Sequence, residues 1–300
     1  MIIALSFIGI LPSYIVEVLH QIRCFYSGDI YLIINDLSSL YLTKIIKYNI
    51  NIVKYNEVIN FEFLNVAEQN KHKFCIVTSL VGREELFIRS FERFFLLRNL
   101  LENKNLTDCF FMELDNLIYD DPNKWIEQFS RHELGYMFDN YNRFSSGIMY
   151  VKNADALYNF QNYILNFIKN SNEFMTEMTV LSNYYENNKD KVQILPTHFP
   201  DKSIPSISYE NYNNYNDTIF DSASYGGYLF GMDTCHTNNV IVKGLKSKWA
   251  FIDCTNLKFS WKVDEKGRNR PYVFNGNEYI LINNLHIHAK NLHEALSLPI

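Results

Sequence analysis

Glycine and proline are scarce in this chain of 300 residues, which contains 11 glycines and 7 prolines. This scarcity excludes a collagen and a glycine- or proline-rich disordered protein. Charged residues make up 20% of the chain and hydrophobic residues 47%, and these shares are ordinary for a globular protein. A chain of this length can bury a substantial core without disulfide bonds or structural metal ions.

The five cysteines form no pair at Cys-x-x-Cys spacing. Their odd number and spacing exclude a zinc ribbon and a disulfide framework, and are typical of a reducing compartment. The net charge of −5 makes nucleic acid an unexpected partner. No segment reaches the ~20 consecutive apolar residues of a membrane span. Residues 1–11 are apolar without a basic start, so we expect a buried first strand and a cytoplasmic protein.

Two apolar runs, residues 2–8 and 30–34, are separated by a helical pattern of apolar residues. Short apolar runs are typical of central strands in a parallel sheet, which is covered on both faces. The β-α-β alternation predicts an α/β fold with a Rossmann-like, mostly parallel central sheet flanked by helices. The composition of the sequence changes after a loop near residue 200 that is bracketed by prolines. We therefore expect two parts, residues 1–205 and residues 206–300, within one continuous domain.

A pair of carboxylates, Glu113 and Asp115, follows the apolar residues 110–112. Residues two apart in a strand point to the same face, and the carboxyl ends of parallel strands form the ligand-binding edge of such sheets. Two carboxylates this close repel each other unless a cation lies between them, and Mg²⁺ or Mn²⁺ accepts such oxygen ligands. The alternative is a solvated strand end before a turn.

A second polar cluster lies near the end of the chain, where His286, His288 and Lys290 alternate with apolar residues. In an extended segment these three side chains share one face. A neutral imidazole is a good ligand for a transition metal, and a lysine can neutralise a phosphate. A polar strand face without a ligand is the alternative.

Three further charged residues are candidates for the site. Arg93 lies on a predicted helix over residues 84–103 that leads into the carboxylate strand, so it can reach a nucleotide. The alternative is a solvated helix face or a pairing with Glu85 or Glu92. Glu177 lies on a predicted helix over residues 173–187 and is either a catalytic carboxylate or a surface residue. Asp221 can cap a short helix, and we also consider it a candidate catalytic carboxylate. No GxxxxGK[ST], GxGxxG, GxSxG or HExxH motif occurs.

Taken together, the residues resemble a nucleotide-sugar-dependent glycosyltransferase of the GT-A fold. The segment Glu113-Leu114-Asp115-Asn116 resembles the DxD motif of that superfamily in an ExD form, and residues 284–290 resemble its late histidine motif. The chain is also similar to a poorly characterised group of glycosyltransferase-like proteins in giant viruses and bacteria. That group shares the segments 113–119, 220–233 and 284–292 with this sequence.

The resemblance implies that Asp115 and His288 bind Mn²⁺ or Mg²⁺. It also implies that Lys290 contacts a diphosphate and that Glu113 and Asn116 lie at the nucleotide. The first strand, around Ser6 and Phe7, is implied to flank the nucleobase.

The implied activity is transfer of a hexosyl or pentosyl group from a nucleoside diphosphate sugar to a glycan, protein or lipid-linked acceptor. Residues 1–205 would form the nucleotide-sugar-binding core. Residues 206–300 would extend the acceptor side and complete the metal and diphosphate site. The acceptor is expected to enter beside residues 220–233 and 173–187. A metal-dependent nucleotidyltransferase or nuclease, and a non-catalytic carbohydrate-binding protein, remain alternatives.

Overall fold

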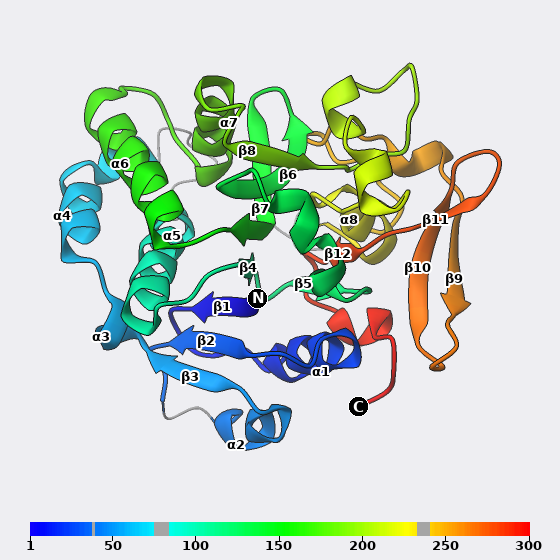
Figure 1. Ribbon diagram of the computed structural model, residues 1–300, viewed down its shortest axis with the longest axis horizontal. Coiled ribbons are helices and arrows are strands. Elements are labelled where there is room, and N and C mark those ends of the chain that lie inside the picture. Colours follow the sequence, from blue (N-terminus) through cyan, green and yellow to red (C-terminus); the bar gives the residue numbers. More distant parts are fainter. Residues whose placement is uncertain (38–39, 75–83, 233–240) are drawn as a thin grey trace.

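The computed structural model describes residues 1–37, 40–74, 84–232 and 241–300 (Figure 1). Cys75, Cys235 and Asp233 lie outside the described residues. The described cysteines, Cys24, Cys109 and Cys254, are free thiols. Among the described residues, no helix combines the length and the apolar character needed to cross a bilayer.

The elements of this part of the chain are as follows. The strands are β1 (Ile2–Phe7), β2 (Ile30–Ile34), β3 (Asn51–Lys54), β4 (Cys109–Met112), β5 (Asn116–Ile118), β6 (Leu134–Asn140), β7 (Arg143–Val151), β8 (Val192–Leu195), β9 (Phe259–Val263), β10 (Asn269–Phe274), β11 (Tyr279–Leu281) and β12 (Asn284–His286). The α-helices are α1 (Ile15–Phe25), α2 (Leu42–Ile45), α3 (Tyr55–Val58), α4 (Phe61–Gln69), α5 (Glu84–Lys104), α6 (Ala154–Asn170), α7 (Glu177–Asn187) and α8 (Ser224–Phe230). Short 3-10 helices cover Ile46–Tyr48, Lys71–Phe74, Pro122–Phe129, Ser206–Ser208, Tyr212–Tyr215, Cys254–Asn256 and Leu292–Ala295.

The central sheet has seven strands in the order β3-β2-β1-β4-β7-β6-β8. Strands β3, β2, β1 and β4 run parallel, and β6 pairs in parallel with β8. Strand β7 runs antiparallel to both of its neighbours, β4 and β6. The predicted α/β fold with a mostly parallel central sheet flanked by helices is therefore confirmed.

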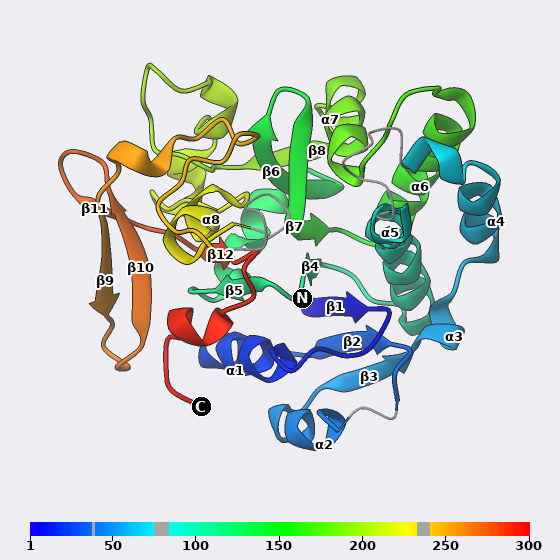
Figure 2. The ribbon, with the colours of Figure 1, turned by 180° about the vertical axis from the view of Figure 1, so that it is seen from behind.

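The core lies on both faces of this sheet, as the side chains of β1 demonstrate. Ile3 and Leu5 pack with the apolar residues of α1, whereas Ile2 and Ala4 pack with those of α4, α5 and α6. This alternation is the two-residue period of a strand, and both sets are buried. Figure 1 shows α4, α5 and α6 together on one side of the molecule, and Figure 2 shows them from behind.

Two small sheets accompany the central one. Strands β9, β10 and β11 form an antiparallel sheet at one edge of the molecule (Figure 1). Strands β5 and β12 form a two-stranded antiparallel sheet, although they are distant in sequence. Residues 143–147 form the first part of β7. Its backbone continues the ladder beyond β4, because Glu113 N donates a hydrogen bond of 3.0 Å to Gly147 O.

Candidate active site

Pairing of β12 with β5 brings the C-terminal histidines to the carboxylates. Asp115 immediately precedes β5, and the antiparallel register sets His286 opposite Asn116. The ladder continues one step further, because Ile287 N donates a hydrogen bond of 2.7 Å to Asp115 O. The site is therefore assembled by backbone pairing at the carboxyl end of β4, the edge at which ligands bind in open α/β sheets.

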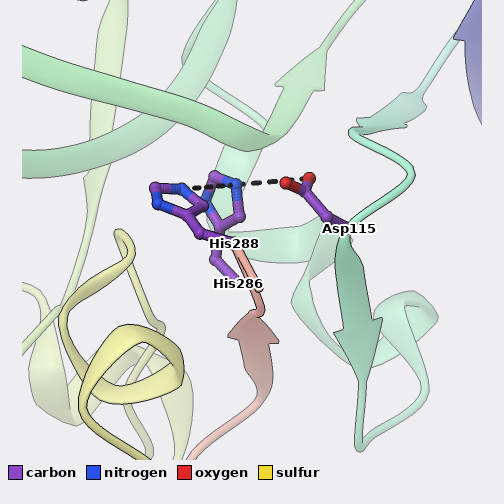
Figure 3. A group of neighbouring side chains, drawn as sticks. All are labelled: Asp115, His286 and His288. Carbon is purple, nitrogen blue, oxygen red and sulfur yellow. Dashed lines mark hydrogen bonds and ion pairs between the residues drawn. The ribbon is translucent and has the colours of Figure 1, made fainter. Parts of the chain in front are cut away.

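The side chains of Asp115, His286 and His288 lie next to one another, with His286 between the other two (Figure 3). His286 Nε2 lies 3.3 Å from Asp115 Oδ1 and 3.1 Å from His288 Nε2. One ligand atom from each residue lies within 4.8 Å of the others. An ion with bonds of about 2.0–2.3 Å holds its ligands roughly 3–4.5 Å apart, so small side-chain movements would close this set around one ion. One carboxylate with two imidazoles therefore fits a divalent transition metal.

Burial and neighbouring charges both shift the pKa values of this group. Burial acts to raise the pKa of Asp115, but Lys290, which pairs with its Oδ2, and His286 outweigh that effect and hold the pKa well below its usual value. Burial and the adjacent His286 lower the pKa of His288 to about 3. His288 is consequently the neutral imidazole that a metal requires, and Asp115 is ionised.

Arg93 on α5 connects side chains from three other parts of the chain, two carboxylates and one hydroxyl. Its guanidinium pairs with Glu113, which follows β4, and donates a hydrogen bond of 2.8 Å to Ser146 Oγ on β7. Its Nη2 also lies 3.5 Å from Glu177 Oε1 at the start of α7. Glu113 Oε2 in turn lies 3.1 Å from His286 Nε2. The predicted role of Arg93 at a nucleotide stays a prediction, and its observed contacts are with the protein.

The variant Arg93→Lys should lower the free energy of unfolding by about 1–2 kcal/mol. A lysine keeps the charge but cannot present the planar fork that reaches three partners. Thermal unfolding followed by circular dichroism measures the change. Arg98→Lys on the same helix is the matched control, because Arg98 pairs with the largely exposed Glu102 and lies over the half-exposed Tyr158 ring, and it should change stability by less than about 0.5 kcal/mol. Equal stability of Arg93→Lys and the wild-type protein would contradict this account of Arg93.

Asp221 and Asn116 lie behind the site, outside the cavity lining. The carboxylate of Asp221 accepts four backbone hydrogen bonds of 2.7–2.9 Å, three from residues 223–226 at the start of α8 and one from His286 N. Asn116 Oδ1 accepts a hydrogen bond of 2.9 Å from Asn284 Nδ2. Asp221 therefore caps α8, as the sequence suggested, and fixes the backbone of a histidine of the site.

A cavity of about 610 Å³ opens over the carboxyl edge of the sheet. The predicted site residues Ser6, Phe7, Arg93, Glu113, Asp115, Glu177, His288 and Lys290 line it. Two further residues line the cavity: His286, which was expected beside His288 without a metal-binding role, and Asp139, which was not selected from the sequence. His286 had a signal, since it shares a strand face with His288, whereas Asp139 is a single carboxylate at the end of an apolar strand.

No protein-family profile and no curated protein matches this chain. Among solved structures, the chain is similar to apo mouse xyloside xylosyltransferase 1 at 10% identity, with 72% of this chain and 93% of that chain covered and a TM-score of 0.47. It is also similar to the glycosyltransferase GlyE of Streptococcus pneumoniae at 13% identity, with 65% and 44% covered and a TM-score of 0.41. A third is the galactosyltransferase LgtC in complex with donor and acceptor sugar analogues, at 12% identity, with 65% and 73% covered and a TM-score of 0.41.

Proposed function

We propose that this protein is a metal-dependent glycosyltransferase that moves a sugar from a nucleoside diphosphate sugar to an acceptor hydroxyl. The observation that carries the proposal is the convergence of Asp115, His286 and His288 beside Lys290 at the ligand-binding edge of the sheet. A metal group with an adjacent lysine, inside a cavity large enough for a nucleotide sugar, suits a diphosphate better than an uncharged ligand.

Asp115, His286 and His288 would hold the ion. Two imidazole ligands favour Mn²⁺ over Mg²⁺, because Mg²⁺ prefers oxygen. When bound, the ion would supply positive charge that stabilises the leaving diphosphate. Lys290 would add to that charge, since its side chain is 43% exposed and its ammonium pairs with the same carboxylate that would bind the ion.

In the transfer, the bond between the anomeric carbon of the sugar and the diphosphate oxygen breaks, and the diphosphate leaves with the electron pair. The acceptor oxygen bonds to the anomeric carbon and passes its proton to the carboxylate of Glu177. Ser6 and Phe7, at the end of β1, would flank the nucleoside, as the sequence resemblance implies. Glu177 is the proposed catalytic carboxylate, because it lines the cavity and burial raises its pKa.

Three of the predicted residues would position other residues of the site. Glu113 would orient His286 through their contact and receive its own position from Arg93. Asn116 would hold the pairing of β5 with β12 through Asn284. For Asp221 we propose a positioning role through the backbone of His286 in place of the catalytic one.

A panel of nucleotide sugars tests the function. The protein is incubated with UDP-, GDP-, ADP- and CDP-sugars, and released nucleoside diphosphate is measured with Mn²⁺ and with excess chelator. We expect at least one donor to release nucleoside diphosphate, at a rate about 100-fold higher with Mn²⁺. Release of pyrophosphate from nucleoside triphosphates would favour a nucleotidyltransferase. Binding of sugars without release would favour a carbohydrate-binding protein. Release at equal rates in chelator would contradict the metal-dependent mechanism.

A further inference from the structure

A tryptophan is held at the opening of the cavity with most of its surface in solvent. Trp249 is 57% exposed and lines the cavity. Its segment is tied to the end of β6, because Asn140 Nδ2 donates a hydrogen bond of 2.6 Å to Trp249 O and Phe251 N donates one of 2.9 Å to Asp139 O. The guanidinium of Arg143 lies 5.7 Å from the centre of the Trp249 ring. The indole is therefore positioned by fixed neighbours while it remains open to a ligand.

Beside this tryptophan lies a buried carboxylate to which no described residue donates a hydrogen bond. Asp139 lines the cavity and is only 4% exposed. Among the described residues its nearest cation is Arg143, with Nη2 at 3.7 Å, and none donates a hydrogen bond to the carboxyl oxygens. Burial raises the pKa of Asp139 to about 7. A buried carboxylate that accepts no hydrogen bond is unfavourable, so a ligand hydroxyl at this point would be bound favourably.

The order of the strands places Trp249 and Asp139 away from the proposed nucleoside position. Along the carboxyl edge, β1 is followed by β4, β7 and β6. Neighbouring strands are about 4.8 Å apart, so the ends of β1 and β6 are separated by about 14 Å. Asp115, one of the three proposed metal ligands, follows β4, and β4 lies between β1 and β6 in the sheet. A donor with its nucleoside at β1 and its diphosphate at the metal group would direct its sugar towards Asp139 and Trp249.

We propose that the end of β6 is the acceptor subsite and that the acceptor is a carbohydrate. The apolar C–H face of a sugar ring stacks on Trp249, and a hydroxyl of the same sugar donates a hydrogen bond to Asp139. This combination of an aromatic face with an adjacent carboxylate suits a sugar ring, which carries an apolar face and a rim of hydroxyls. The assignment of this site to the acceptor rests on the proposed function. The assignment of a carbohydrate as the ligand rests on the side chains of Trp249 and Asp139.

Saturation-transfer NMR with simple glycosides tests the subsite. The probes are methyl glucoside, methyl galactoside, methyl xyloside, lactose, maltose and cellobiose, each added to the intact protein. We expect at least one to bind, with the strongest transfer to the ring C–H protons of one face. Trp249→Ala should weaken that binding about tenfold, and Trp249→Phe should restore part of it. Asp139→Asn should also weaken it about tenfold.

Trp261→Ala is the matched control, because Trp261 is partly exposed but lies against Tyr119 and Phe230 outside the cavity lining. It should bind the glycoside as the wild-type protein does. The proposal is overturned if no glycoside binds, if Trp249→Ala binds as the wild-type protein does, or if Trp261→Ala loses binding equally. Thermal unfolding of each variant identifies any that fails to fold, and Trp249→Phe then replaces Trp249→Ala as the decisive variant.

The outcomes also separate this inference from the proposed function. Release of nucleoside diphosphate without glycoside binding leaves the transferase intact and overturns the carbohydrate acceptor, and transfer to a serine-containing peptide would do the same. Glycoside binding that depends on Trp249, without release from any donor, supports the subsite and overturns the transferase.

Discussion

Asp115→Asn should weaken Mn²⁺ binding at least about 100-fold and reduce release of nucleoside diphosphate by at least the same factor. An asparagine has the shape of the aspartate but lacks its negative charge, so the described group would offer the ion two imidazoles and no carboxylate. The fold should persist, because Asn keeps the shape of Asp115, and Lys290, whose side chain is 43% exposed, remains in contact with solvent when its partner is lost.

Isothermal titration with Mn²⁺ alone measures the first effect, and the donor panel measures the second. Asp155→Asn, an exposed aspartate in the first turn of α6, and His293→Ala, outside the cavity lining, are the matched controls and should behave as the wild-type protein. His288→Ala should have an effect similar to that of Asp115→Asn. The double variant should be little worse than either single one, because groups that act as a unit are not additive. Independent, multiplying effects would contradict a shared ion.

Two adjacent glycines of α8 should respond in opposite ways to the same substitution. A Cβ on Gly226 would overlap the carbonyl oxygen of His286, and it would lie 2.7 Å from the carbonyl carbon and 2.9 Å from Asp221 Oδ2. A Cβ on Gly227 would meet nothing closer than Met232 Cγ at 3.8 Å. Gly226→Ala must therefore displace the backbone of a proposed metal ligand, and we expect a loss of about 2–3 kcal/mol in the free energy of unfolding. Gly227→Ala should be neutral or stabilising by up to about 1 kcal/mol.

Thermal unfolding of both variants, with Mn²⁺ titration of each, measures this contrast. Gly226→Ala should lose stability and Mn²⁺ affinity together, whereas Gly227→Ala should lose neither. If Gly226→Ala retained wild-type Mn²⁺ affinity, the close packing of α8 against His286 would have no part in forming the site.

The sequence predicted the sheet well, because its apolar runs and helical periods are local signals. The two carboxylates at the ligand-binding edge of the sheet could also be predicted from the sequence, since Glu113 and Asp115 directly follow an apolar strand. The meeting of Asp115 with His288 was expected from a family resemblance alone. Its physical cause is the pairing of β5 with β12, and no local pattern encodes which distant strands pair.

Other features of the site depended on tertiary contacts that a sequence does not display. Arg93 was expected near a nucleotide, but its position among Glu113, Ser146 and Glu177 depends on how α5 packs on the sheet. Asp139 gave no signal, because its importance comes from burial beside a tryptophan that lies more than one hundred residues later in the chain.

The central claim, that one ion joins the three side chains to a nucleoside diphosphate, can be tested by pulsed electron paramagnetic resonance. The protein is loaded with Mn²⁺ and, in separate samples, with UDP, GDP, ADP or CDP. We expect at least one sample in which a single Mn²⁺ species shows coupling to two imidazole nitrogens and to phosphorus, and the nitrogen coupling should fall to one imidazole in His288→Ala. Phosphorus coupling without nitrogen in every sample, or nitrogen coupling without phosphorus, would contradict the account.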